Sequence, residues 1–221
     1  CMHTLIDFDA ITSHTAQPAG STALRLAFGT PCETLVAREP GEVKTVLQAV
    51  HARACQGYWC VGYVRYEAAP AFDAALHVHP ATGPLVWFGV HDAPLPEEKT
   101  RTDTSAVVDT PRVRWQPGLA RARFDATLER LHQAIGDGEI YQLNFTARTP
   151  GELQVPPAEL FAAMRQAQPG GFAAYIDTGE EQVLSVSPEL FFDWHQGHLI
   201  ARPMKGTARR GRNPQEDAAL A

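Results

Sequence analysis

The sequence of 221 residues lacks several features that would assign it to a specialised class of protein. It contains no run of about eighteen apolar residues, so we expect no helical membrane span. Its first residues lack the basic start and the apolar stretch of a secretory signal, so we expect a cytoplasmic location. The formal net charge is -6, and this deficit of positive charge argues against nucleic acid as the main partner.

Cysteine is also scarce. The four cysteines are Cys1, Cys32, Cys55 and Cys60. They form no C-x-x-C pair, and the gap between Cys55 and Cys60 fits no common zinc pattern, so reduced structural cysteines are expected. His77 and His79 alternate as metal ligands on a strand do, but the solvated face of a short strand explains them equally well. We therefore assign no metal site to this chain.

The composition is otherwise that of an ordinary globular protein able to bury a substantial core, with 44% hydrophobic and 20% charged residues. The length suits one large domain or two small ones. Residues 93–112 are rich in Pro, Glu, Lys, Thr, Asp and Ser, which is typical of a loop or a junction. We therefore predict an N-terminal subdomain over residues 1–112 and the first half of a catalytic region over residues 113–221.

Hydrophobic periodicity predicts the elements of both parts. Helices are expected at residues 42–55, at 123–137, where Gly136-Asp137-Gly138 ends the pattern, and after Pro156-Pro157. Strands are expected at residues 24–28, 58–67, 85–91, 141–148, 172–177, 182–186, 190–195 and 198–202. The last four of these strands form two hairpins. Helices followed by antiparallel strands predict an α+β fold.

The strand at residues 141–148 separates apolar from polar side chains most clearly. Tyr141, Leu143 and Phe145 alternate with Gln142 and Asn144. The two amides either belong to the wet face of a sheet or face a polar cavity, where an amide can both donate and accept hydrogen bonds. The sequence leaves both possibilities open.

Positive charge is concentrated near the C-terminal end. Five of the eleven residues from Arg202 to Arg212 are basic, although the chain as a whole is acidic. A local patch whose charge opposes that of the whole protein favours an anionic ligand held at one place. The patch contains Lys205, between the apolar Met204 and Gly206, which permits close approach of a ligand to the backbone.

Lys205 and Glu189 are the candidates for chemistry. Burial and neighbouring cations lower the pKa of a lysine and make its amine nucleophilic, although a surface lysine on a basic turn is the simpler reading. Glu189 follows Pro188 at the start of a strand. It is either an exposed carboxylate of a turn or a partly buried general acid or base. The two hairpins allow Lys205 and Glu189 to lie on one side of a sheet.

Three motifs give these residues a context. In chain order they are GEIYQLNFT at residues 138–146, SPELF at 187–191 and RPMKGTARRG at 202–211. Together they resemble the chorismate-utilising enzyme family, and the similarity runs from about Tyr58 to the last residue. The resemblance implies the α+β fold of that family, with antiparallel sheets that face each other and flanking helices.

The resemblance also implies an activity. Family members that make anthranilate carry a small residue at the position of Lys205, whereas a lysine there is typical of members that make 4-amino-4-deoxychorismate on the route to folate. Lys205 would attack C2 of chorismate while Glu189 protonates the departing C4 hydroxyl, and ammonia would then enter at C4. Gly206 and Thr207 would line the substrate site.

The implied partners are chorismate, a glutamine amidotransferase subunit that supplies ammonia, and Mg²⁺. The family continues well beyond Ala221 and carries its magnesium ligands there, so this part alone is expected to be inactive. Two alternatives stay open: synthesis of anthranilate or isochorismate, and a non-catalytic domain that binds an anion or docks a partner.

Overall fold

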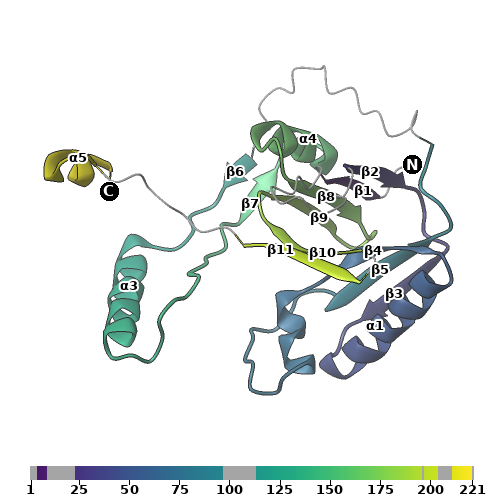
Figure 1. The fold of residues 1–221 in the computed structure, drawn as a ribbon, viewed down its shortest axis with the longest axis horizontal. Helices are drawn as coiled ribbons and strands as arrows, with labels where there is room; N and C mark the ends of the chain where they lie inside the picture. The colour runs from purple at the N-terminus through teal and green to yellow at the C-terminus, as the bar shows by residue number, and fades with distance from the viewer. Residues whose placement is uncertain (1–3, 9–22, 97–112, 196, 204–210, 221) are drawn as a thin grey trace. The chain divides into compact units, whose positions relative to one another are not determined.

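The computed structural model describes the chain except residues 1–3, 9–22, 97–112, 196, 204–210 and 221. It divides into two compact units (Figure 1). Unit 1 comprises Cys1–Asp103 and Met164–Ala221, and unit 2 comprises Thr104–Ala163. Helices and antiparallel sheets together make up the chain, which confirms the α+β class. Among the described helices, none is both long and apolar enough to cross a membrane.

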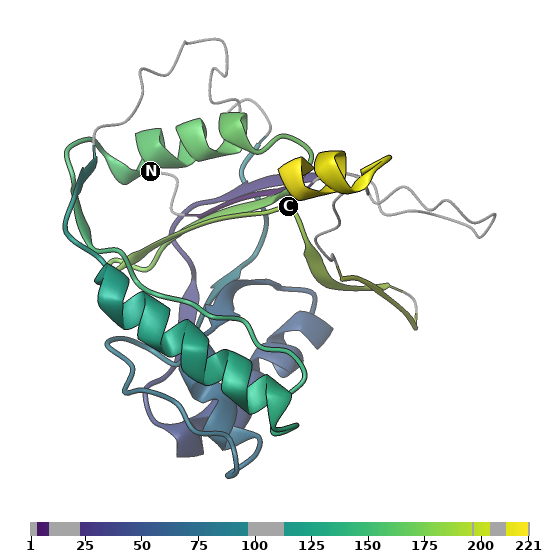
Figure 2. The same ribbon diagram turned by 90° about the vertical axis from the view of Figure 1, so that its left-hand side faces the viewer.

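The larger sheet of unit 1 joins segments from opposite ends of the sequence (Figure 2). Its strands have the order β2-β1-β8-β9 and are all antiparallel to their neighbours. Their bounds are β1 Thr4–Phe8, β2 Leu24–Phe28, β8 Phe172–Asp177 and β9 Gln182–Ser187. The β8–β9 hairpin and β2 confirm the predicted strands. Strand β1 was not predicted from the sequence, although it pairs with both β2 and β8.

The second sheet of unit 1 carries a helix on one face. Its strands have the order β3-β5-β4 and comprise β3 Glu33–Ala37, β4 Trp59–Val64 and β5 Val86–His91. Helix α1 (Pro40–Cys55) buries Val43 completely against this sheet. The core there consists of Ala37, Val43, Ala68, Leu85 and Val86. The helix begins just before its predicted start, because Glu42 accepts hydrogen bonds from the backbone N–H groups of Arg38 and Glu39.

The strand predicted at residues 58–67 is correct for β4 but extends too far. The chain turns into a short 3₁₀ helix, η1 (Tyr66–Ala71), which contains Pro70. Aromatic and β-branched residues favour a strand up to Val64. Beyond it, the backbone N–H of Arg65 still donates to the carbonyl of Leu85 at 2.8 Å, and from Tyr66 the backbone turns into η1.

The two sheets of unit 1 share aromatic contacts. The ring of Phe28 on β2 is fully buried, with its centre 5.9 Å from that of Trp59 on β4 and 4.8 Å from that of His91 on β5. The backbone N–H of Leu95 donates to the carbonyl of Ala27 at 2.7 Å. Side chains far apart in the sequence therefore close one core between the sheets.

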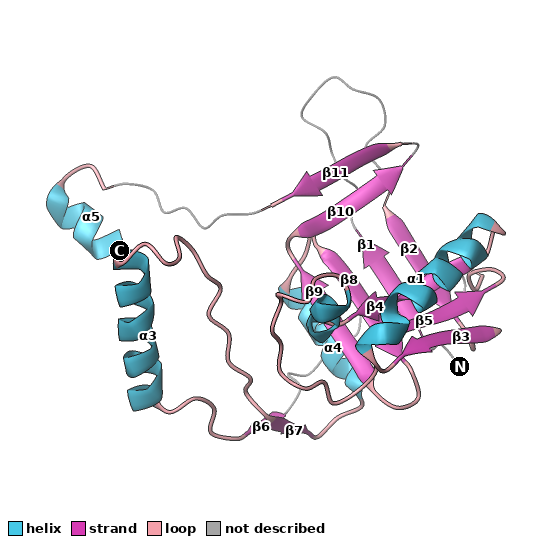
Figure 3. Ribbon diagram, turned by 90° about the horizontal axis from the view of Figure 1, so that it is seen from below, coloured by secondary structure: helices cyan, strands magenta, loops and turns pink. Residues whose placement is uncertain are grey.

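A two-stranded hairpin follows β9 in the sequence of unit 1 (Figure 3). It consists of β10 (Leu190–His195) and β11 (His198–Arg202), as predicted, with an irregular register between Leu190 and Asp193. Most of its large apolar side chains are exposed, namely Phe191, Phe192, Trp194 and Leu199. The short helix α5 (Pro214–Leu220) lies near the end of the described chain.

Unit 2 has few regular elements. Strands β6 (Val113–Trp115) and β7 (Gly151–Leu153) pair antiparallel, and helix α3 (Arg121–Gly136) lies between them in sequence. The helix ends at the predicted glycines, where Gly138 adopts a φ of +77°. Helix α4 (Pro157–Ala167) crosses from unit 2 into unit 1, where its Arg165 forms an ion pair with Asp7.

The strand predicted at residues 141–148 is wrong. Residues 142–150 have no regular secondary structure, and Tyr141 is 92% exposed. Alternation of apolar and polar side chains favours an extended backbone, but a strand also requires a hydrogen-bonding neighbour. The described part of the chain supplies no such neighbour for this segment. The division proposed at residue 112 stays a prediction.

Candidate active site

The residues predicted to carry the chemistry lie in one stretch of the chain. Lys205, Gly206 and Thr207 fall outside the described residues, so their roles stay predictions. Glu189 is described and exposed, in the connection between β9 and β10. Arg202, the last residue of β11, leads towards Lys205.

The turn that presents Glu189 is closed by a serine. The Ser187 hydroxyl accepts the backbone N–H of Glu189 at 3.1 Å and donates to the carbonyl oxygen of the same residue at 2.9 Å. Gly171 lies against this turn, and a Cβ there would come within 2.6 Å of the Ser187 carbonyl oxygen. The motif Ser-Pro-Glu thus has a local structural reason, which is to fix the backbone at Glu189.

The register of the next hairpin determines what lies beside this turn. Leu190, next to Glu189 in sequence, pairs with Arg202 on β11. The side chain of Leu190 is 9% exposed, whereas that of the following Phe191 is 86% exposed. The lysine motif therefore begins at a residue, Arg202, that is paired with the neighbour of Glu189.

A cluster of charged and polar side chains in unit 1 surrounds Glu181, which lies in the turn between β8 and β9. The Tyr63 hydroxyl and the Arg65 guanidinium both donate to its carboxylate. Neighbouring Glu180 binds Arg38 at 2.6 Å. This cluster connects the turn between β8 and β9 to the sheet that carries α1, and it was not predicted from the sequence.

Burial and hydrogen bonding have opposite effects on the pKa of Glu181. Burial alone would raise the pKa of Glu181, but the hydrogen bonds from Tyr63 and Arg65, with the charges of Arg65 and Arg38, outweigh it and lower the pKa. Burial, together with the carboxylate of Glu181, raises the pKa of Tyr63. Glu181 is therefore ionised and Tyr63 neutral at neutral pH.

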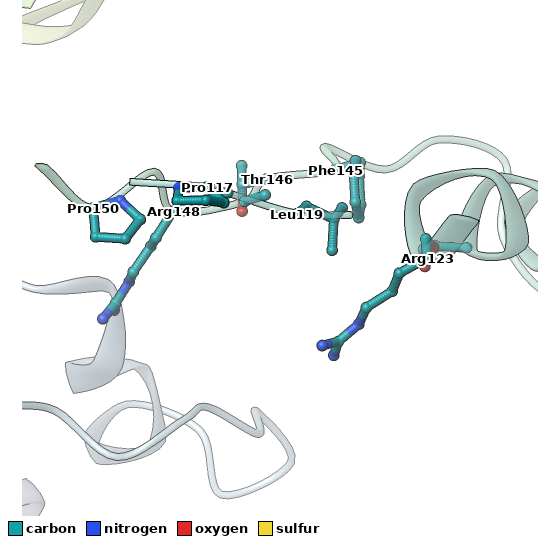
Figure 4. A pocket seen from close by; sticks show the side chains of 10 residues that line it. Pro117, Leu119, Arg123, Phe145, Thr146, Arg148 and Pro150 are labelled. Carbon is teal, nitrogen blue, oxygen red and sulfur yellow. Dashed lines mark hydrogen bonds between the residues drawn. The ribbon is translucent and has the colours of Figure 1, made fainter. Parts of the chain in front are cut away.

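Unit 2 contains a cavity of about 490 Å³ (Figure 4). Its lining residues come from the segment before α3, from α3 itself and from the extended segment after it, and are Pro117, Gly118, Leu119, Arg123, Thr127, Phe145, Thr146, Ala147, Arg148 and Pro150. Gln142 and Asn144, whose amides were candidates for a polar cavity, do not line it. Arg123 and Arg148 were not predicted to line a site, because hydrophobic periodicity identifies only the apolar positions of a segment.

Metal ligands do not gather in the described part of the chain. No group of three or more His, Cys, Asp or Glu side chains is placed there to hold a metal ion. His77 and His79 lie in a segment without regular structure. Among the described residues, none therefore fits as the Mg²⁺ site that the resemblance implies.

Comparison with known proteins agrees with the motifs. The family model for chorismate binding enzymes matches residues 20–221. The chain is 34% identical over 98 residues to aminodeoxychorismate synthase component 1 of Bacillus subtilis, a match that covers 44% of this chain and 21% of that protein. It is 32% identical over 110 residues to anthranilate synthase component 1 of Thermus thermophilus, covering 50% of this chain and 24% of that protein.

A third relative, aminodeoxychorismate synthase component 1 of Klebsiella aerogenes, is 30% identical over 134 residues, covering 61% of this chain and 28% of that protein. The three matches thus cover between 21% and 28% of the relatives' own lengths. Proteins that make two different products match over similar spans. Because the family model extends over most of the sequence, the chain belongs to the family of chorismate binding enzymes.

Proposed function

We propose that this chain is part of an enzyme that aminates chorismate at C4 to give 4-amino-4-deoxychorismate, with Lys205 as nucleophile and Glu189 as proton donor. Two of the relatives described above are named aminodeoxychorismate synthase component 1, which supports this product. The lysine between Met204 and Gly206 favours it over anthranilate, because the family resemblance implies a small residue at this position in members that make anthranilate.

The observation that carries the proposal is the pairing of Leu190 with Arg202. It brings the glutamate turn beside the strand that leads to Lys205. Lys205 lies three positions after Arg202, and three residue steps of extended chain span at most about 11 Å. Glu189 is exposed, so a ligand can reach its carboxyl group.

The proposed chemistry has two substitutions. In the first, the lone pair of the Lys205 amine attacks C2 of chorismate, the ring double bond shifts, and the C4–oxygen bond breaks. The hydroxyl leaves as water with the proton of Glu189. In the second, ammonia attacks C4, the double bond shifts back, and the C2–nitrogen bond breaks to release the lysine. Covalent catalysis thereby divides one difficult substitution into two easier ones.

Ammonia for this reaction would come from a glutamine amidotransferase partner in the cytoplasm, with Mg²⁺ at the substrate carboxylate. No step assigned to this chain passes through the metal, since the described residues include no cluster that would ligate it. Gly206 and Thr207 would contact the substrate through a backbone amide and a hydroxyl group.

Trapping the covalent adduct tests the proposal. The full-length protein is incubated with chorismate and Mg²⁺ without ammonia, and its intact mass and peptide map are measured. We expect an adduct localised to Lys205, which disappears when ammonia is added. Unmodified Lys205 under conditions that support turnover contradicts the covalent route.

Two variants distinguish the proposed roles of Lys205 and Glu189. Lys205→Ala should abolish formation of 4-amino-4-deoxychorismate while leaving chorismate binding within about threefold, because the amine is needed chiefly in the transition state. Glu189→Gln keeps the size of the side chain and removes its proton, so the adduct should form far more slowly. Equal losses of binding and turnover in both variants would instead indicate a domain that only binds the anion.

The anthranilate synthase of Thermus thermophilus favours one alternative, synthesis of anthranilate. A product assay with isotopically labelled ammonia distinguishes the two reactions. The label is expected at C4, and label at C2 would overturn the proposed product.

A further inference from the structure

Helix α1 carries a histidine and a cysteine close to its C-terminal end. His51 and Cys55 are four positions apart, so their side chains lie on one face of the helix, one turn from each other. The Sγ atom of Cys55 is 3.5 Å from the Nε2 atom of His51. Both residues are exposed, so an ion in the solvent can reach both atoms. Neither residue has a role in the proposed chemistry.

The separation of the two atoms suits a metal ion that binds to both. In a tetrahedral zinc site the metal lies about 2.3 Å from a thiolate sulfur and about 2.0–2.1 Å from an imidazole nitrogen. With a tetrahedral angle between these bonds, the sulfur and the nitrogen are about 3.5 Å apart. Cys55 and His51 already have this separation, so one ion can bind to both side chains while the backbone stays helical.

The other described cysteines have different partners. The Cys32 thiol donates to the carbonyl of Val90 at 3.2 Å, and the Cys60 thiol donates to the carbonyl of Val50 at 3.6 Å. A thiol must lose its proton before it can bind a metal, and both of these thiols use that proton in a hydrogen bond to the backbone. Cys55 instead lies beside a ring nitrogen, which is itself a metal ligand.

The charges near this pair also favour a cation. Arg53 lies between the two residues in sequence, but its guanidinium binds the Glu33 carboxylate at 2.6 Å and donates to the Gln56 side chain at 3.1 Å. The positive charge of Arg53 is therefore compensated. Cys55 is the last residue of α1, and the C-terminal end of a helix carries a partial negative charge that attracts cations.

We propose that His51 and Cys55 bind one divalent ion of the zinc class, with water at the remaining positions. Thiolate and imidazole ligands suit Zn²⁺ and Co²⁺, whereas Mg²⁺ prefers oxygen ligands. With two protein ligands the site is smaller than the groups of three that are absent from the described residues. Binding releases the thiol proton of Cys55 to the solvent, so the affinity rises with pH. The site does not depend on the proposed amination.

A titration with Co²⁺ tests the site, because thiolate ligation gives Co²⁺ a charge-transfer absorption in the near ultraviolet. Cys1 and His3 lie outside the described residues, so Cys1→Ser and His3→Ala are introduced into the 221-residue chain that serves as parent. We expect one Co²⁺ to bind per chain, and Zn²⁺ but not an excess of Mg²⁺ to displace it. Absence of the absorption, or displacement of Co²⁺ by Mg²⁺, overturns the proposal.

Single substitutions identify the two ligands. Cys55→Ser should abolish the charge-transfer absorption. His51→Ala should weaken Co²⁺ binding at least about tenfold, because the second ligand no longer binds intramolecularly. The matched controls are Cys32→Ser, at another exposed cysteine, and His132→Ala, at an exposed histidine of α3, and both should bind Co²⁺ as the parent does. Unchanged binding in His51→Ala, or absorption retained in Cys55→Ser, overturns the site.

Hydrogen exchange gives a second readout that does not depend on the absorption. An ion held by both side chains joins two successive turns of α1, so Zn²⁺ should slow amide exchange at residues 51–56 in the parent chain. The same addition should leave exchange there unchanged in His51→Ala and in Cys55→Ser. Equal slowing in the parent and in both variants would attribute the effect to metal bound elsewhere and would overturn the site.

Discussion

Helices α1 and α3 are both sixteen residues long and both were predicted from the same kind of apolar periodicity, yet they have opposite environments. Val43 of α1 is fully buried against the β3-β5-β4 sheet. No residue of α3 is buried, and its Ile135 is 43% exposed. Isolated helices of this length are only marginally stable in water. The periodicity of a sequence thus identifies a helical face but does not supply the surface that stabilises it.

Hydrogen exchange should show the largest difference between the two helices. In the 221-residue chain at neutral pH, we expect the central amides of α3 to exchange roughly a thousandfold faster than those of α1, because α3 opens locally whereas α1 opens with the core of unit 1. Mass spectrometry of peptides that span each helix measures this ratio. Equal protection of both helices would break the comparison.

Truncation of one side chain on each helix gives a second measurement. Val43→Ala removes two buried methyl groups and should lower the free energy of unfolding by about 2 kcal/mol. Leu128→Ala on the half-buried face of α3 should lower it by less than about 1 kcal/mol. Urea unfolding followed by tryptophan fluorescence measures both. A larger loss for Leu128→Ala would mean that α3 carries more of the stability than its exposure indicates.

The helices and hairpins that depend on residues close together in the sequence were predicted correctly. Periodicity gave α1 and α3 to within two residues at their starts, and the turn chemistry of Gly179 and Gly197 gave both hairpins of the C-terminal part. Local patterns did not predict β1. Thr4–Phe8 is a strand because it pairs with residues 24–28 and 172–177, and such long-range pairing leaves no local pattern in the sequence. For the same reason an alternating segment was taken for a paired strand.

The candidate site likewise has a local part that the sequence predicts and a long-range part that it does not. Ser187-Pro188-Glu189 was recognisable as a motif, and its turn is local. The convergence of Tyr63 and Arg65 on Glu181 joins residues more than a hundred positions apart. The only local signal was that Tyr63 and Arg65 stand two residues apart, which places their side chains on one face of an extended chain. Their partner could not be identified without the fold.

Ion pairs extend the comparison to electrostatics. Unit 1 has the long-range cluster at Glu181, with a side chain 29% exposed, whereas α3 has the local pair of Arg121 and Asp125, with side chains 85% and 51% exposed. Glu181→Gln should lower the free energy of unfolding at pH 7 by about 1–2 kcal/mol, since two donors lose a charged acceptor. Asp125→Asn should change it by less than about 0.5 kcal/mol. Thermal unfolding of both variants beside the parent chain measures the difference.

The pH dependence of the free energy of unfolding tests whether the charge of Glu181 causes its stabilising effect. The pKa of Glu181 is lowered in the folded chain from its ordinary value of 4.5, so its contribution is complete above that value and is lost as the pH falls towards the lowered pKa. The difference between the parent chain and Glu181→Gln should therefore be constant over about pH 6 to 8, and should shrink below about pH 4.5. A difference that persists unchanged in acid would attribute the loss to packing rather than to charge.

Two glycines allow the smallest and most direct test of the comparison. Gly41 lies in the first turn of α1 and Gly136 in the last turn of α3, and a Cβ added at either would meet no atom within 4 Å. Alanine in place of a helical glycine favours the helix by up to about 1 kcal/mol. Gly41→Ala should raise the free energy of unfolding of unit 1 by about 0.5 kcal/mol, because α1 unfolds with its sheet. Gly136→Ala should leave that value unchanged and slow exchange only within α3. If both substitutions raise global stability equally, α3 unfolds together with the core despite its exposed surface, and the two helices differ in burial without differing in cooperativity.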